Sequence, residues 1–304
     1  MILKEFPDIN WLRKQIETRF ENQTAWDGKK LSHPGWPTVI LNTQAKKTLR
    51  ENIVGPLSLF TNRNGKSVIS VKGKQVVVTE NTFFVSNPAQ SYTLHIPEAA
   101  ETFNIHVGEK TGEEVWHEAI HSNNYLLDYP HEISTSIELQ NQLCWRTESI
   151  NLIIDRLTLS ENEMQEQELI GELVFQLLND KIKLLKNSTQ LSATKISTRE
   201  EIVRRLHIAS DFIYSHFDQP LSLDLLSEAS FLSKFHLLRL FKEYFHETPH
   251  QFITRLRLEK SIEHLKTTHY SVKEISQKVG IEDPSSFSRL FRNHFGVYPS
   301  QFTA

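Results

Sequence analysis

The chain has 304 residues, of which 38% are hydrophobic, and this length suits about two domains that each bury a core. Its 34 lysine and arginine residues and 37 aspartate and glutamate residues give a formal net charge of −3, so charge alone does not indicate a polyanion partner. A single cysteine, Cys144, excludes an intrachain disulfide framework, and we expect it to be a small buried hydrophobe in a reducing cytoplasm. No leader opens the chain and no apolar run approaches about 18 residues, so we expect a cytoplasmic protein that does not enter a membrane.

The N-terminal part of the chain predicts one helix followed by many short strands. Residues 9–25 carry apolar side chains at helical spacing. Between residues 55 and 107, six short segments rich in β-branched and aromatic residues follow one another closely. Asn64-Gly65 is a strong hairpin signal between two of them, and Lys72-Gly73-Lys74 is a second turn. This pattern predicts a small β-sandwich or β-barrel.

One short stretch matches a metalloprotease motif. His117-Glu118-Ala119-Ile120-His121 reads HExxH, in which two histidines one helical turn apart bind zinc and the glutamate acts as a base. No third histidine follows at the metzincin spacing, because Asn124 and Asp128 occupy that stretch. So short a motif arises by chance in a chain with 14 histidines. We therefore predict no catalytic residues, no metal and no cofactor, with a metallohydrolase as a remote alternative.

Residues 135–158 and 161–186 predict two helices. The second carries a wide apolar stripe at spacings of three and four residues: Leu169, Ile170, Leu173, Val174, Leu177, Leu178, Ile182 and Leu185. The stripe has two interpretations: it packs against the β-rich region, or it forms a dimer interface in which Leu169, Leu173 and Leu177 are the candidate contacts. Residues 187–198 are polar and rich in serine and threonine, which is typical of a linker.

The last third of the chain repeats itself. Residues 239–252 read RLFKEYFHETPHQF, and residues 289–302 read RLFRNHFGVYPSQF, fifty positions later. Residues 199–304 contain 14 lysine and arginine residues against 13 aspartate and glutamate residues, a net charge of +1 before their eight histidines are counted. A repeated supersecondary unit with basic residues on it indicates two equivalent surfaces for nucleic acid.

The first copy, residues 222–244, predicts a helix-turn-helix motif. Ser222 is a plausible cap for a short amphipathic helix, and Ser233 for a second helix from about Lys234 to Tyr244. Apolar side chains alternate there with Lys234, His236, Arg239 and Lys242. Such a helix fits a DNA major groove, where arginine bonds to guanine and lysine to phosphate.

The second copy, residues 271–294, follows the same order. Ser271 caps a helix that stops at Gly280, and Ser285, Ser286 and Phe287 open the next one, which carries Arg289, Arg292 and His294. Between the copies, residues 251–265 predict a linking helix with Arg255, Arg257, Lys260 and Glu263 on its outer side. A rigid link fixes the spacing of two recognition helices, and successive major grooves on one DNA face lie about 34 Å apart.

These motifs together resemble a known family. The stretches LSLDLLSEASFLSKFHLLRLFKEYF and SVKEISQKVGIEDPSSFSRLFRNHFGVYPSQF make residues 206–304 similar to the DNA-binding module of the AraC/XylS family of bacterial transcription regulators. The resemblance implies seven helices, with one recognition helix in each half. The chain departs from the family pattern at Leu238, where a polar base reader is common; the alternatives there are contact with a thymine methyl or no base contact. It also departs at His246, where glycine is usual, and at Ile281, where phenylalanine is usual.

The resemblance also implies which residues contact DNA. Phe235, Leu238 and Arg239 match base-reading positions of the first recognition helix, and Ser285, Ser286 and Arg289 match those of the second. Lysine and arginine nearby suit phosphate. The predicted DNA contacts are Lys234, Phe235, His236, Leu238, Arg239, Lys242, Ser285, Ser286, Arg289 and Arg292.

We therefore predict an α+β protein. Residues 1–186 form a cupin-like β-barrel or sandwich with helices, which senses an effector and dimerises, residues 187–198 are a linker, and residues 199–304 are an all-α double helix-turn-helix domain. His95 and His106 are isolated, so the paired-histidine metal motif of catalytic cupins is missing. The predicted partners are double-stranded promoter or operator DNA, a second copy of the chain, a small-molecule effector, and RNA polymerase if the protein activates. The alternative is a ligand-independent regulator whose barrel serves only dimerisation or protein contacts.

Overall fold

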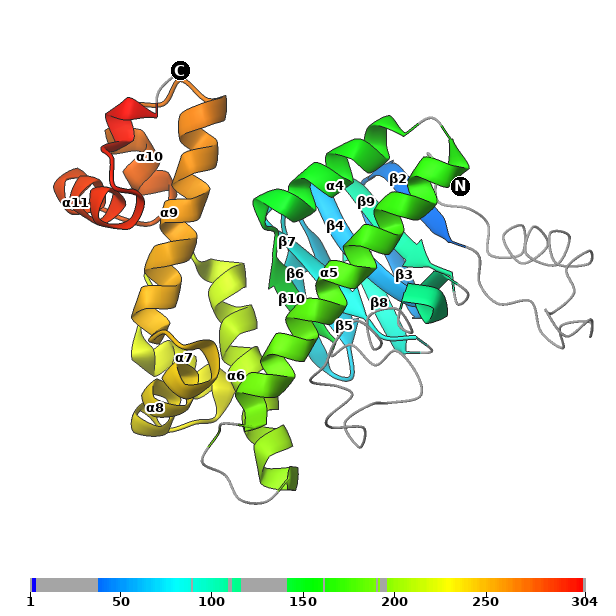
Figure 1. Cartoon of the computed structure of the whole chain (residues 1–304), viewed down its shortest axis with the longest axis horizontal. Helices are drawn as coiled ribbons and strands as arrows, with labels where there is room; N and C mark the ends of the chain where they lie inside the picture. Colours follow the sequence, from blue (N-terminus) through cyan, green and yellow to red (C-terminus); the bar gives the residue numbers. More distant parts are fainter. Residues whose placement is uncertain are drawn as a thin grey trace, which may run out of the picture. The chain divides into compact units, whose positions relative to one another are not determined.

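The computed structural model describes residues 2–3, 38–88, 90–108, 111–115, 141–160, 162–189, 191 and 196–302. Two compact units make up the chain, Met1–Lys183 and Leu184–Ala304, and each is described by itself (Figure 1). The predicted helix over 9–25 and the HExxH residues 117–121 lie outside the described ranges. No helix in those ranges is long and apolar enough to cross a membrane.

The N-terminal unit contains two β-sheets. The larger has the strand order β1-β2-β9-β4-β7-β10 and the smaller the order β3-β8-β5-β6. Its strands are β1 Ile2–Leu3, β2 Val39–Ala45, β3 Thr48–Val54, β4 Leu57–Asn64, β5 Ser67–Val71, β6 Lys74–Val78, β7 Thr82–Ser86, β8 Ser91–Ile96, β9 Ala100–Val107 and β10 Gln142–Trp145. The pairs are antiparallel except for β1 with β2. With a helical C-terminal unit, this arrangement confirms the predicted α+β class.

Both faces of the larger sheet are covered. Successive side chains of a strand point to opposite faces, so Leu57 and Leu59 of β4 lie in a core shared with the helices, while Phe60 points the other way. Phe60 meets Tyr92 of β8 with ring centroids 4.8 Å apart, and Asn62 Nδ2 donates to the Val78 carbonyl of β6 at 2.8 Å. The two sheets therefore pack as a sandwich.

Two helices cover the outer face of the larger sheet: α4, Glu148–Leu159, and α5, Glu163–Thr189 (Figure 1). Thr147 caps α4 by accepting a hydrogen bond from the N–H of Ile150. The stripe of α5, including Leu169, Leu173 and Leu177, is buried in the same core as the outer face of the sheet. The first interpretation of the stripe is therefore the observed one. The side chains of these three leucines are buried by contacts within their own unit, so they are not exposed to a second copy. This corrects their assignment to a dimer interface.

Several strands were not predicted. Strand β10 lies within the range that was predicted to be helical. The chain is extended there because it pairs with β7 at the edge of the larger sheet and buries Leu143. Strands β2 and β3 precede the predicted β-rich range, and β3 alternates half-buried with exposed residues instead of apolar with polar ones. The Lys72-Gly73 turn joins the paired strands β5 and β6, as expected. The Asn64-Gly65 turn instead joins strands of different sheets, so the predicted hairpin is wrong there.

The C-terminal unit is helical. Its elements are α6 Ile196–His216, α7 Leu223–Ser230, α8 Lys234–Phe245, α9 Pro249–Thr267, α10 Val272–Lys278, α11 Pro284–Phe295 and the 3-10 helix η2 Pro299–Gln301. Helix α9 packs against α8 in the first half of the unit and against α10 and α11 in the second. The predicted linker over 187–198 overlaps the end of α5 and the start of α6, so the stretch between these helices is shorter than expected.

Candidate nucleic-acid interface

The first helix-turn-helix motif is built by two serine caps and a sharp turn. Ser222 Oγ accepts from the N–H of Leu225 at the start of α7, and Ser233 Oγ accepts from the N–H of His236 at the start of α8. Between them Phe231 adopts a left-handed conformation with φ of 55°, which turns the chain after α7. Both predicted caps and the predicted extent of α8 are confirmed to within one residue.

Helix α8 has one buried face and one outward face. The buried face consists of Leu237, Leu240, Phe241 and Tyr244. Opposite it, at positions i, i+3, i+4 and i+7, lie the exposed residues Phe235, Leu238, Arg239 and Lys242. Lys234 and His236 are exposed beside this face. The six predicted contacts of the first copy thus belong to one helix and are all open to solvent.

The second motif repeats this design with a different cap. Ser271 begins α10 in a capping box with Glu274, and Gly280, with φ of 80°, turns the chain after it. Asp283 caps α11 by accepting from the N–H groups of Ser285 and Ser286, which lie in the first turn of the helix as expected. The hydrogen bonds from Ser286, and then that from Ser285, hold the pKa of the Asp283 carboxyl below its usual value.

Helix α11 presents the equivalent outward face. Phe287 and Phe291 are buried beneath it. Fifty positions after their counterparts in α8 lie Ser285, Ser288, Arg289 and Arg292, of which Ser285 and the two arginines are exposed and Ser288 is half-buried. Of the ten predicted DNA contacts, Ser286 alone is half-buried; the other nine are exposed.

The cations of the two faces have different local partners. Arg239 Nη1 lies 2.9 Å from Glu243 Oε1 on its own helix, and Lys234 forms an ion pair with Asp224 of α7. The guanidinium of Arg292 donates to the Tyr298 hydroxyl and lies over the Tyr298 ring, 4.7 Å from its centroid. The cations of these pairs are exposed, whereas Glu243, the partner of Arg239, is half-buried.

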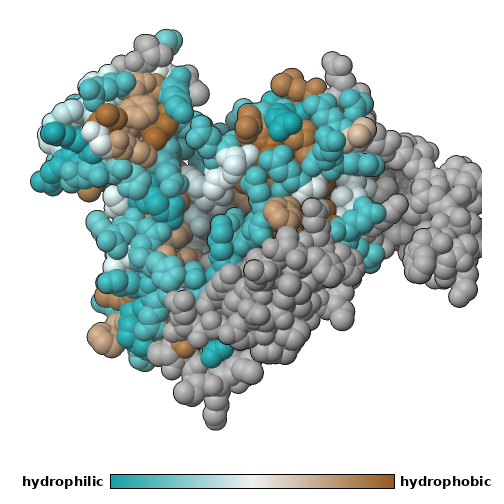
Figure 2. All heavy atoms as spheres, in the orientation of Figure 1, coloured by the Kyte–Doolittle hydropathy of each residue, from teal (hydrophilic) through white to brown (hydrophobic). Residues whose placement is uncertain are grey.

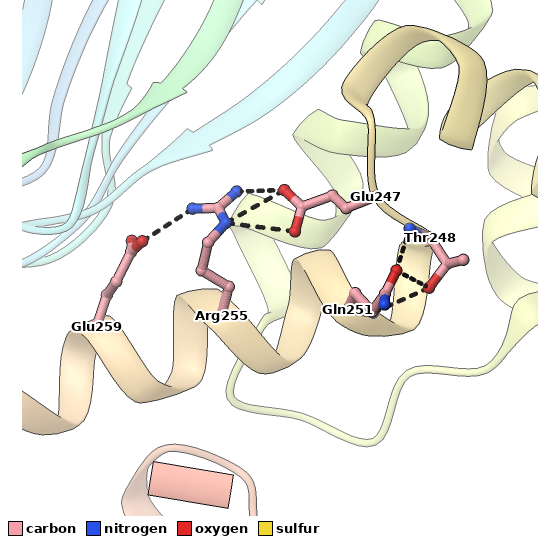
Figure 3. Close-up of polar contacts among 5 residues, drawn as sticks. All are labelled: Glu247, Thr248, Gln251, Arg255 and Glu259. Carbon is pink, nitrogen blue, oxygen red and sulfur yellow. Dashed lines mark hydrogen bonds and ion pairs between the residues drawn. The ribbon is translucent and has the colours of Figure 1, made fainter. Parts of the chain in front are cut away.

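Helix α9 fixes the two motifs within one body. Its capping box joins Thr248 and Gln251, and Arg255 lies between Glu247 and Glu259 at 2.8 and 3.0 Å (Figure 3). The acidic partners are held on the same helix or just before it. Arg255 therefore stiffens α9 and its start rather than offering a free cation to DNA.

A second arginine of α9 reaches across the unit. Arg257 Nε and Nη2 donate to the carbonyls of Phe217 and Gln219, both at 2.7 Å, in the loop between α6 and α7. A Cβ added to Gly280 would lie 2.6 Å from the Asp218 carbonyl oxygen of that loop. The turn of the second motif therefore contacts the first half directly. No sequence pattern predicted this role, because the acceptors are backbone carbonyls about 40 residues away.

Lys260 was predicted to lie on the outer face of α9, and this prediction is wrong. It is buried, and its Nζ lies 2.8 Å from Glu263 Oε1, which is half exposed. The cause is that α9 packs against neighbours on more than one side, so its surface is not divided into one apolar and one polar face. Its amphipathic pattern was therefore a weak guide to burial.

Two helix-turn-helix motifs on one rigid body define a DNA-binding module. A family model described as "Helix-turn-helix domain" matches residues 226–304. The chain is 34% identical over 92 residues to the regulatory protein SoxS of Salmonella typhimurium, a match that covers 30% of this chain and 86% of SoxS. It is 31% identical over 110 residues to the multiple antibiotic resistance protein MarA of the same species, covering 35% of this chain and 84% of MarA.

Among solved structures, an AraC-type transcriptional regulator from Chromobacterium violaceum is 29% identical, with a TM-score of 0.32, over 33% of this chain and 89% of the other. The chain belongs to the AraC/XylS family of transcription regulators. It is a DNA-binding regulator and not an enzyme.

Proposed function

We propose that this cytoplasmic regulator reads two neighbouring segments of major groove, with α8 in one and α11 in the next, and that an effector bound by the N-terminal unit controls it. The observation that carries the first part is the repetition of one outward face, at i, i+3, i+4 and i+7, in both recognition helices. Arg239 and Arg289 occupy the same place in the two copies and suit guanine. Lys234, Lys242 and Arg292 suit phosphate.

The test starts with selection of bound fragments from genomic DNA, followed by salt titrations. We expect a site with two half-contacts about one helical turn apart. Arg239→Ala should cost about 1–3 kcal/mol on that site and little on random DNA, because paired hydrogen bonds to guanine are lost. Lys242→Ala should weaken binding to all sequences alike and flatten the salt dependence.

A matched control is available on α6. Arg204 is exposed and paired with Glu201 on its own helix, as Arg239 is with Glu243. Arg204→Ala should therefore leave site-specific binding unchanged. Equal losses on selected and random DNA for Arg239→Ala would remove Arg239 from the base-reading surface.

The polar residues on the inner face of the N-terminal sandwich support the proposal that this unit binds an effector. Strand register places Ser86, Ser58 and His106 side by side across β7, β4 and β9. Ser58 Oγ lies 2.8 Å from His106 Nδ1, and Ser86 Oγ is a buried oxygen with no hydrogen-bond partner in the described part of the chain. Buried polar groups are normally paired, so a small uncharged ligand with a hydrogen-bond donor suits this row.

The rival is a regulator without a small-molecule ligand. In this reading the N-terminal unit serves only dimerisation or protein contacts, and the groove of about 310 Å³ lined by Lys46, Asn64 and Glu101, which is open to solvent, binds no effector. A thermal-shift screen of small polar compounds distinguishes the two. A stabilising compound whose effect is lost in Ser86→Val supports the effector, and an empty screen supports a unit that serves only dimerisation or contact with RNA polymerase.

A further inference from the structure

The two recognition helices carry the same cations beside different neighbours. Positions 239 and 289 are both arginine, and positions 242 and 292 are both basic. The other two members of the outward face are Phe235 and Leu238 in α8, but Ser285 and Ser288 in α11. The two copies therefore share their basic positions but differ at the other two positions of the face, which are apolar in α8 and hydroxyl-bearing in α11.

The apolar pair of α8 is openly displayed. Phe235 is 74% exposed and Leu238 is 41% exposed, three residues apart on the face that also holds Arg239. Figure 2 shows hydrophobic groups at the surface among hydrophilic ones in this part of the molecule. A single exposed apolar residue needs no explanation. Two on one helix face, bordered by Lys234 and Lys242, combine an apolar surface with attraction for a polyanion.

Base-pair chemistry narrows what such a pair can read. Neither Phe235 nor Leu238 can donate or accept a hydrogen bond through its side chain. The one apolar group on the base edges of the major groove is the C5-methyl of thymine. Burying the pair against guanine, cytosine or adenine would leave polar edges without partners, which is unfavourable.

The second copy has the opposite chemistry. The hydroxyl of Ser285 is exposed, and Ser288 Oγ donates to the Pro284 carbonyl at 2.9 Å, which leaves its lone pairs to accept. Arg239 is paired with Glu243 on its own helix, and Arg289 lies within the electrostatic influence of Asp283, the cap of α11. Each arginine therefore has an acidic neighbour, and the serine hydroxyls beside Arg289 are what distinguish α11 from α8.

We propose that the two halves of the operator differ in base chemistry: α8 reads thymine methyl groups through Phe235 and Leu238, and α11 reads guanine through Arg289 with serine hydroxyls beside it. The proposal rests on the proposed function, since it requires both helices to lie in major grooves. It makes the operator asymmetric, because thymine methyls are contacted under α8 and not under α11, whereas Arg239 and Arg289 suit a guanine in each segment.

The test removes one methyl at a time. In the selected site, each thymine is replaced by deoxyuridine, which pairs identically but lacks the C5-methyl. We expect about fourfold weaker binding for each contacted methyl, the equivalent of about 0.8 kcal/mol. The sensitive thymines should lie in the half-contact that Arg239→Ala abolishes. Replacing guanine by 7-deazaguanine, which lacks the N7 acceptor, should weaken binding in both half-contacts, because Arg239 and Arg289 both suit guanine, whereas deoxyuridine should weaken only the half-contact of α8.

Variants show whether the methyl sensitivity belongs to α8. In Phe235→Ser and Leu238→Ser, which reproduce the residues of α11, deoxyuridine should bring no further loss. Leu225→Ser is the matched control, because Leu225 is 42% exposed but lies on α7, and it should keep the full deoxyuridine effect.

The outcomes separate the two proposals. A specific site whose affinity does not change with deoxyuridine overturns the methyl reading and leaves the regulator intact. Specific binding that survives Phe235→Ser, with loss of transcription alone, assigns the apolar pair to a protein partner and also overturns it. Failure to recover any specific site removes both proposals.

Discussion

At the scale of single residues, His106 shows how burial changes chemistry in the N-terminal unit. Burial lowers the pKa of its imidazole to about 4, and its Nδ1 faces Ser58 Oγ. The ring also meets Phe60 edge-on, with centroids 5.9 Å apart. A histidine held neutral in the folded state is protonated near its ordinary pKa once the chain unfolds.

This difference predicts a loss of stability in mild acid. Between pH 6.5 and about 4 the unfolded chain binds a proton at His106 that the folded chain does not, so the free energy of unfolding falls as pH decreases through this window. The expected contribution is about 1–3 kcal/mol at pH 4. Urea unfolding at several pH values should show this slope in the wild type and a shallower one in His106→Asn.

The control is His95, an exposed histidine on β8 of the same unit. His95→Asn should leave the pH dependence of unfolding as in the wild type. If His106→Asn and the wild type lose stability in parallel between pH 6.5 and 4, His106 is not the group that titrates.

At the scale of elements, two glycines with the same backbone conformation distinguish local strain from packing between the motifs. Gly280 and Gly296 have φ of 80° and 79°. A Cβ on Gly296 would meet nothing within 4 Å, whereas one on Gly280 would lie 2.6 Å from the Asp218 carbonyl oxygen. Gly296→Ala should cost about 1–2 kcal/mol for the left-handed conformation alone, and Gly280→Ala should cost clearly more.

The larger cost should come with a change in DNA spacing. Because Gly280, after α10, and Arg257 of α9 both contact the loop after α6, Gly280→Ala should relax the preferred distance between half-contacts. Binding to operators with one base pair inserted or deleted between the halves measures this. Equal stability losses and equal spacing profiles for the two alanine variants would show that the contact at Gly280 does not set the geometry.

The sequence was informative for elements whose signals are local. Caps, turns and the fifty-residue repeat predicted α7, α8, α10 and α11, and β-branched runs predicted β4 to β9. Strand β10 was missed because its partner, β7, lies about sixty residues earlier. The burial of Lys260 and the role of Arg257 were missed for the same reason: both depend on packing between segments far apart in the chain, which periodicity does not record.

At the scale of the whole molecule, the surface for a second copy has to be sought away from the buried stripe of α5. Helix α4 displays Leu152 and Leu159 seven residues apart, on the side opposite its buried isoleucines, and Met164 follows in the first turn of α5. The three are 59%, 77% and 72% exposed. Large apolar side chains that are exposed in this way favour association, and we propose that homodimerisation uses Leu152 and Leu159 of α4.

Leu159→Glu tests the surface, because it places a charge where burial would have to leave it unpaired. We expect the wild type to sediment as a dimer and Leu159→Glu to sediment as a monomer at the same concentration. Leu49→Glu is the control: Leu49 is 56% exposed on β3 of the same unit, and the variant should remain dimeric. A wild type that is monomeric at all concentrations, or a dimer that tolerates Leu159→Glu, contradicts the assignment. With a dimer, each operator would present two asymmetric sites, and the monomeric variant would occupy them independently, with a shallower dependence of binding on protein concentration.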